Sequence, residues 1–133
     1  MAILVGLFSK TPKDPLKKKH VEKLKEIKKL VKEKKYDSAL KSGKDFLYKV
    51  PYHHDVLFTM GGIYYLQKKY KTAISYFDKA LEIASYDVEI LLLKAYSHQK
   101  IGENKRAIQC CEKIQEVDPK NKVVLALLQE LNS

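Results

Sequence analysis

Apolar residues recur every three to four positions along most of the chain, which is the spacing of one face of an α-helix. In the stretch 17–35, for example, Leu24, Ile27, Leu30 and Val31 form one apolar stripe among lysines and glutamates. Outside the first eight residues, no run alternates between apolar and polar residues as a half-buried strand would. The pattern therefore predicts helices and no sheet.

The helical pattern repeats with a period of 34 residues. Alanines mark the period at Ala39, Ala73 and Ala107, and twelve residues after them stand Pro51, Ser85 and Pro119. The two prolines stand where a helix must stop. Short polar turns at 68–71 (KKYK) and 102–105 (GENK) divide the second and third units into two helices each. One helix pair cannot cover its own apolar face, so the units are expected to stack.

In these features the sequence resembles the tetratricopeptide repeat (TPR) family. The second unit matches the family signature at Leu57, Met60, Gly61, Tyr64, Ala73, Phe77 and Ala80, and has Ser85 where the family has proline. The third unit keeps Leu91, Ala95, Ala107 and Pro119, and the first keeps Ala39 and Pro51. The residues expected to pack the repeats together are Ala39, Gly61, Tyr64, Ala73, Phe77, Ala80, Ala95 and Ala107.

The resemblance implies an all-α fold, a right-handed helical-repeat solenoid of about three TPR-like helix pairs followed by a C-terminal capping helix. The repeats are expected at about 20–53, 54–87 and 88–121, and the capping helix at about 121–132. Asp14 and Pro15 predict that the array starts at residue 15, because aspartate caps helices and proline is favoured at the first helical position. Residues 1–14 would then be an apolar segment and linker. The run 123–128 is unusually apolar for a cap, so part of it is expected to stay exposed.

TPR arrays usually bind partners in a concave groove lined by the first helix of each unit. The resemblance therefore implies a non-enzymatic protein–protein interaction scaffold or adaptor that binds a peptide or a partner helix. The groove positions are Leu24, Lys28, Val31, Phe58, Gly62, Tyr65, Leu66, Leu92, Tyr96, Gln99 and Lys100. Aromatic and aliphatic side chains with lysines at both ends suit an acidic or amphipathic segment with apolar anchors, and Phe58, Tyr65 and Tyr96 are the predicted anchors. One subset of the family grips a C-terminal carboxylate with paired asparagines; Gly62 and Tyr96 occupy those positions here, which argues against that mode.

The charge of the chain suggests an alternative. The 133 residues include 26 Lys and Arg, of which only Arg106 is arginine, against 16 Asp and Glu, for a net charge of +10. Residues 1–51 hold 15 lysines and six acids, a net charge of +9. A basic patch is predicted at Lys25, Lys28, Lys29 and Lys32. It is either a solvated helix surface or a site that attracts an anionic membrane, nucleic acid or an acidic protein tail. The near absence of arginine disfavours base-specific DNA recognition.

The apolar residues 1–8 (MAILVGLF) allow three interpretations. They pack on the first helix pair, enter the groove of a neighbouring molecule, or touch a membrane beside the lysines. The second would give self-association, for which the apolar C-terminal helix is another candidate. The segment is too short to span a bilayer and lacks the pattern of a signal peptide, so we expect a soluble, cytoplasmic protein.

Catalytic and metal-binding patterns are weak. His53 and His54 are adjacent in a turn where Asp55 is the only further local ligand, so they are expected to be exposed, and no metal is expected. Cys110 and Cys111 are adjacent and are interpreted as buried small hydrophobic residues. The five glycines are dispersed and form no phosphate-binding loop. No cofactor is expected.

Overall fold

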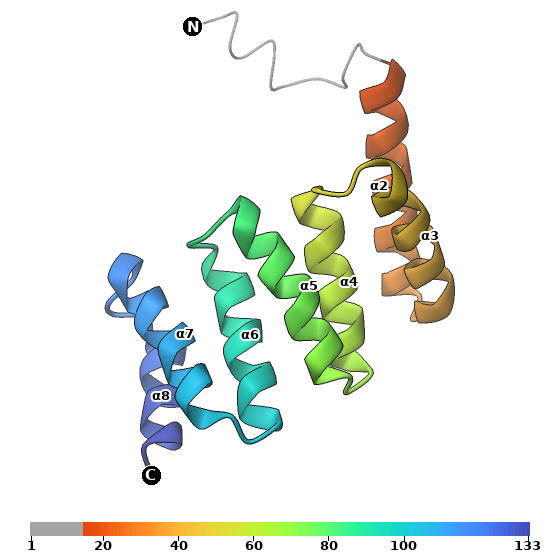
Figure 1. Cartoon of the computed structure of the whole chain (residues 1–133). Coiled ribbons are helices and arrows are strands. Elements are labelled where there is room, and N and C mark those ends of the chain that lie inside the picture. Colours follow the sequence, from red (N-terminus) through yellow and green to blue (C-terminus); the bar gives the residue numbers. More distant parts are fainter. Residues whose placement is uncertain (1–14) are drawn as a thin grey trace, which may run out of the picture. The chain divides into compact units, whose positions relative to one another are not determined.

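The computed structural model describes residues 15–133, and every regular element within them is an α-helix (Figure 1). The helices are α2 (Pro15–Lys32), α3 (Tyr36–Lys49), α4 (His54–Leu66), α5 (Tyr70–Ile83), α6 (Val88–Lys100), α7 (Asn104–Val117) and α8 (Lys122–Leu131). The predicted all-α fold is confirmed for these residues, and α8 stands where the capping helix was expected. The N-terminal segment 1–14 lies outside the described residues.

The chain forms two compact units that divide within α3, after Ser42. The described part of the first unit consists of α2 and the N-terminal half of α3, and its buried apolar side chains are Ile27, Ala39 and Leu40. The second unit, Gly43–Ser133, contains the helix pairs α4–α5 and α6–α7 and the final helix α8 (Figure 1). From α4 onward each helix packs against the next, as a stack of helical repeats requires.

The helices α4, α6 and α8 begin with the same N-terminal capping hydrogen bond, and the capping residues are 34 positions apart. In each case the side chain before the helix accepts a hydrogen bond from the backbone N–H three residues later. The accepting residues are His53, Asp87 and Asn121, with distances of 3.4, 3.1 and 3.0 Å. These caps satisfy N–H groups that have no partner inside the helix, and they fix where each helix starts.

The turns between paired helices also share one conformation at the same interval. Lys34, Lys68 and Gly102 have positive φ angles of 59°, 62° and 78°, which is the left-handed region. A residue in this region ends a helix and reverses the chain, and glycine adopts it with the least strain. Two of the three turns thus place a lysine in a conformation that favours glycine.

Close contact between α4 and α5 depends on small residues. A Cβ atom added to Gly61 would lie 2.5 Å from Cε1 of Phe77, and Ala73 and Ala80 on α5 are completely buried. Tyr64 stacks on Tyr76 with ring centroids 5.5 Å apart. All eight residues predicted to pack the repeats are buried.

A second buried cluster fixes α8 to the rest of the unit. Its members come from α6, α7 and α8: Leu91, Ala95, Ala107, Cys110, Cys111, Ile114, Val124, Leu127 and Leu131. Both cysteines are buried, as predicted. The prediction that the final helix keeps some apolar surface is also confirmed, because Val123 and Leu125 are 49% and 46% exposed.

Candidate functional site

Equivalent positions of α4, α6 and α8 recur at intervals of 34 residues, and we group the side chains of these three helices as one candidate surface of the second unit. We call this surface the α4–α6–α8 face. It comprises Phe58, Gly62, Tyr65 and Leu66 on α4, Leu92, Tyr96, Gln99 and Lys100 on α6, and Lys122, Val123, Ala126 and Glu130 on α8. The first eight were predicted from the sequence, and the four on α8 were not.

A hollow of about 350 Å³ lies between α6 and α8. Its lining is mostly apolar and consists of Tyr96, Lys122, Val123, Ala126, Leu127 and Glu130. Beside it, Nε2 of Gln99 donates a hydrogen bond to Oε1 of Glu130 at 3.0 Å. The same 34-residue period could have revealed the residues of α8, because Ala126 and Glu130 are the equivalents of Leu92 and Tyr96.

Two tyrosines from successive repeats approach each other on this face. Burial raises the pKa of Tyr65, and the neighbouring phenols of Tyr70 and Tyr96 raise it further. The rings of Tyr65 and Tyr70 meet edge to face, with centroids 5.5 Å apart. Tyr65 is therefore held by aromatic neighbours, and it stays a neutral hydrogen-bonding group well above neutral pH.

The α4 part of the face is open. No atom lies within 4 Å of a Cβ added to Gly62, and Leu66 is 57% exposed. Phe58 is partly buried, with its ring 6.4 Å from that of Phe77 in the core. Leu92 packs partly against the buried cluster of α6, α7 and α8. The face thus offers accessible apolar and aromatic surface on a rigid support.

The three remaining predicted groove residues belong to the first unit. On α2, Leu24 and Val31 are partly buried and Lys28 is exposed. The predicted basic patch is also on α2, where Lys25, Lys28, Lys29 and Lys32 are all exposed. The candidate site consists only of residues of the second unit.

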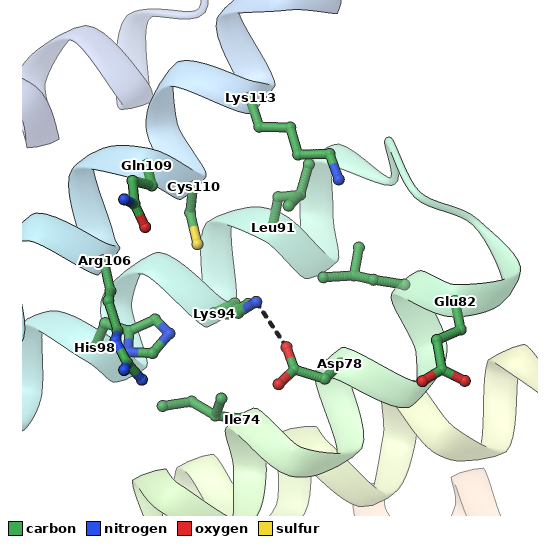
Figure 2. A pocket seen from close by; sticks show the side chains of 11 residues that line it. Ile74, Asp78, Glu82, Leu91, Lys94, His98, Arg106, Gln109, Cys110 and Lys113 are labelled. Atoms are coloured by element: carbon green, nitrogen blue, oxygen red, sulfur yellow. Dashed lines mark ion pairs between the residues drawn. The ribbon is translucent and has the colours of Figure 1, made fainter.

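A second hollow, of about 500 Å³, lies among α5, α6 and α7 and differs in chemistry (Figure 2). Lys94 Nζ lies 2.6 Å from Asp78 Oδ1 across it, and Arg106 and Lys113 stand on its α7 side. At its edge, Nδ1 of His98 lies 2.9 Å from Oε1 of Glu103, and this hydrogen bond holds the pKa of Glu103 below its usual value. The lining is charged, whereas the α4–α6–α8 face is mostly uncharged.

The cysteines near this hollow are poor nucleophiles. Burial raises the pKa of Cys110, and burial together with Cys110 and Glu112 raises that of Cys111 to about 11. The thiolate, which is the reactive form, is therefore scarce at neutral pH.

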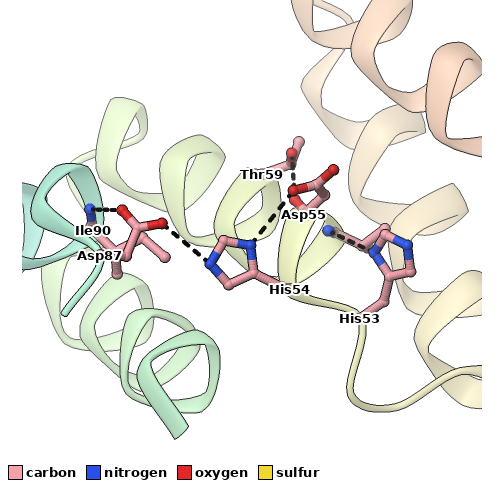
Figure 3. Close-up of polar contacts among 7 residues, drawn as sticks. His53, His54, Asp55, Thr59, Asp87 and Ile90 are labelled. Atoms are coloured by element: carbon pink, nitrogen blue, oxygen red, sulfur yellow. Dashed lines mark hydrogen bonds and ion pairs between the residues drawn. The ribbon is translucent and has the colours of Figure 1, made fainter. Parts of the chain in front are cut away.

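Two histidines at the start of α4, His53 and His54, contact the first residues of α4 and of α6 (Figure 3). His54 lies between two carboxylates, with Nδ1 at 3.4 Å from Asp55 and Nε2 at 3.3 Å from Asp87. The expectation that His53 and His54 are exposed is wrong: both are partly buried, because His53 caps α4 and His54 reaches the residue that caps α6. Within residues 15–133, no group of three or more His, Cys, Asp or Glu side chains is arranged to hold a metal ion.

Along the described part of the chain, no helix has both the length and the apolar composition to cross a bilayer.

Comparison with known proteins identifies the repeat. A tetratricopeptide repeat family model matches residues 64–131, just over half of the chain. No curated protein matches the sequence.

Several solved structures have the same fold. The first TPR domain of Spaghetti (RPAP3), bound to the HSP90 peptide SRMEEVD, is 18% identical, with a TM-score of 0.77 over 84% of this chain and 89% of its own. The second TPR domain of human RPAP3, in complex with the HSP70 peptide SGPTIEEVD, is 16% identical, with a TM-score of 0.77 over 85% and 94%. The Yersinia enterocolitica type III secretion chaperone SycD, in complex with a peptide of the translocator YopD, is 14% identical, with a TM-score of 0.72 over 86% and 87%.

Proposed function

Because the chain belongs to the tetratricopeptide repeat family, we propose that it is a non-enzymatic interaction module that binds a segment of a partner protein on its α4–α6–α8 face. One observation carries the proposal. Tyr96 lines the apolar hollow between α6 and α8, and on α4 the position of Gly62 is open and Leu66 is 57% exposed. The peptides present in related structures of the same fold support this assignment.

The expected ligand is an extended or helical segment with apolar anchors. An aromatic or aliphatic side chain of the ligand would enter the hollow beside Tyr96, and a second would lie over Gly62 and Leu66. Buried aromatic contacts of this kind contribute most of the affinity at protein interfaces. The exposed lysines Lys100 and Lys122 at the edges of the face favour acidic residues beside the anchors.

The ligand is expected to bind through an internal segment, without a free C-terminal carboxylate. Gly62 and Tyr96 offer no side-chain amide at the positions where carboxylate-binding members of the family have asparagine. The HSP90 and HSP70 peptides of the RPAP3 structures both end in glutamate, valine and aspartate. This chain is expected to prefer a different class of sequence.

Selection from a random peptide display library on the full chain tests the proposal. The selected peptides are synthesised with amidated C-termini, and their dissociation constants are measured by fluorescence anisotropy. Tyr65→Ala and Tyr96→Ala are each expected to weaken binding by about tenfold or more, the effect typical of an interface anchor. Tyr48→Ala is the matched control, because Tyr48 is 90% exposed and lies on α3, away from the face.

Binding within about twofold of wild type is expected for the Tyr48→Ala control, which alters exposed surface only. The proposal is wrong if the selected peptides bind both groove variants as tightly as wild type. Loss of binding on amidation would instead show that a carboxylate is recognised, contrary to the expected ligand class.

A further inference from the structure

Exposed, positively charged lysines gather on one side of α2. They are Lys17, Lys18, Lys25, Lys28, Lys29 and Lys32, and we call this surface the lysine face. At about 100° and 1.5 Å per residue, the six positions span about 120° of the helix circumference and about 22 Å of the length of this 18-residue helix. The two glutamates of α2, Glu22 and Glu26, both lie along one edge of the lysine face.

The lysine face is not neutralised within the described chain. Among residues 15–133, the ion pairs nearest to it are Lys23 with Glu26 at 3.5 Å and Lys35 with Glu33 at 3.9 Å. Neither pair includes a member of the lysine face. Pairs such as Lys25 and Lys29 stand one helical turn apart, where like charges destabilise a helix.

Other helices of the chain distribute their charge differently. The helix α7, for example, carries a mixture of three basic and two acidic residues in the sequence NKRAIQCCEKIQEV. A helix that needed only solubility would gain from the same mixture, because opposite charges one turn apart are favourable. A polyanionic surface would relieve the repulsion on α2 and thus accounts for its arrangement.

We propose that the lysine face docks on the headgroups of an anionic phospholipid bilayer. Lysine ammonium groups act as point charges toward phosphates, and each one close to an anionic membrane strengthens binding by roughly fivefold. Six such groups on one side of a straight helix match a flat anionic surface. This role goes beyond the proposed peptide binding and does not depend on it.

The same residues fit nucleic acid less well. Residues 15–35 contain no arginine and no Phe, Tyr or Trp, so they lack the guanidinium forks and the stacking rings that single-stranded and base-specific recognition use. The uncharged apolar sequence MAILVGLF (1–8) precedes α2 in the chain, and an apolar segment next to a basic one is a pattern typical of reversible membrane attachment.

Vesicle flotation with the full chain tests the proposal. The protein is mixed with phosphatidylcholine vesicles that either contain or lack phosphatidylserine. Wild type is expected to float only with the anionic vesicles. The variant with Lys25→Glu, Lys28→Glu, Lys29→Glu and Lys32→Glu is expected to lose roughly a hundredfold or more in its partition coefficient.

A matched control variant distinguishes the effect of losing the lysine face from the effect of lowering the net charge of the protein. Reversing four exposed lysines of the second unit, Lys44, Lys49, Lys105 and Lys120, gives the same change in net charge, from +10 to +2. This control is expected to bind anionic vesicles within about threefold of wild type, since it leaves the lysine face intact. Equal loss in both variants would overturn the proposal, because it would show that binding follows net charge alone.

A second set of variants guards against misfolding. Glutamine at the same four positions of α2 removes the charge but keeps a good helix former, and circular dichroism verifies the helical content. Loss of vesicle binding by this folded variant supports the proposal, and retention contradicts it. Wild type that fails to float with anionic vesicles, or that binds double-stranded RNA more tightly than the vesicles through these lysines, would also overturn it.

Discussion

The α4–α6–α8 face and the lysine face of α2 are two exposed surfaces with contrasting chemistry. The first combines tyrosines and apolar side chains from three helices, whereas the second presents six like charges on one helix. Charge divides in the same way: residues 1–42 hold 13 lysines and five acids, a net of +8, and residues 43–133 hold 13 basic and 11 acidic residues, a net of +2. Most of the net positive charge of the chain therefore belongs to the unit that carries the lysine face. The lysine face is suited to an anionic partner bound by electrostatic attraction, and the α4–α6–α8 face to a partner bound by apolar and aromatic contacts.

The largest expected effect is a separation of the two binding activities. Glutamate at Lys25, Lys28, Lys29 and Lys32 should weaken binding to anionic vesicles by several hundredfold, because about fivefold is lost for each of the four lysines. The affinity of a selected peptide for the same variant should change by less than about threefold, since the variant leaves the α4–α6–α8 face and its flanking lysines, Lys100 and Lys122, unchanged. Flotation and anisotropy on one protein preparation measure both quantities. Parallel loss of both activities would show that the two surfaces act as one site.

The next effect concerns two adjacent glycines of α4 that face different surroundings. Gly61→Ala places a Cβ against the ring of Phe77 and should lower the free energy of unfolding by about 1–3 kcal/mol. Gly62→Ala meets no atom and should raise it by about 0.5–1 kcal/mol, because alanine favours the helix. Urea denaturation of both variants measures the difference. Vesicle binding should be unchanged in each folded variant, and equal effects of the two changes would contradict this packing of α4 on α5.

The salt dependence of the binding affinity should also differ between the two surfaces, with a smaller effect. Raising the ionic strength from about 0.05 to about 0.2 M should weaken vesicle binding by roughly tenfold, because surface charges are screened over a shorter distance. Peptide affinity should fall by less than about twofold, apart from the contribution of any acidic flank. Titrations at several salt concentrations provide the two slopes. Equal slopes would mean that the peptide also binds mainly by charge.

The smallest effect compares one backbone feature in both units. Lys34→Gly and Lys68→Gly should each raise the free energy of unfolding by about 0.5–1 kcal/mol, because both lysines have positive φ angles. The gain should be similar in the two variants at high salt, where charge repulsion is screened. Thermal denaturation measures it. A loss of stability in either variant would contradict the left-handed turn at that residue.

Much of the fold could be predicted because the 34-residue period is a local signal. Ala39, Ala73 and Ala107 are buried where two helices must approach, so their spacing reports the repeat directly. The left-handed turns between the paired helices are harder to predict from the sequence. The turns at Lys34 and Lys68 have no glycine, and their equivalence to Gly102 becomes clear only from the backbone angles.

The candidate site could be predicted only in part. The residues on α4 and α6 follow from the repeat register, and the same register could have given Ala126 and Glu130 on α8. The place of Lys122 and Val123 in the hollow beside Tyr96 depends on how α8 packs. The contact of Tyr65 with Tyr70 depends likewise on the turn between α4 and α5. The charged hollow among α5, α6 and α7 includes the ion pair between Lys94 and Asp78, whose partners no local pattern connects.

The affinity of a selected peptide for the Gly62→Leu variant measures most simply whether the α4–α6–α8 face binds the partner segment. A leucine side chain would occupy the open surface at this position of α4, and since a Cβ here meets nothing within 4 Å, the core should be undisturbed. We expect an unfolding free energy at least equal to that of wild type and peptide binding weakened by about tenfold or more. A folded Gly62→Leu protein that binds the peptide as tightly as wild type would contradict the proposed binding on the α4–α6–α8 face.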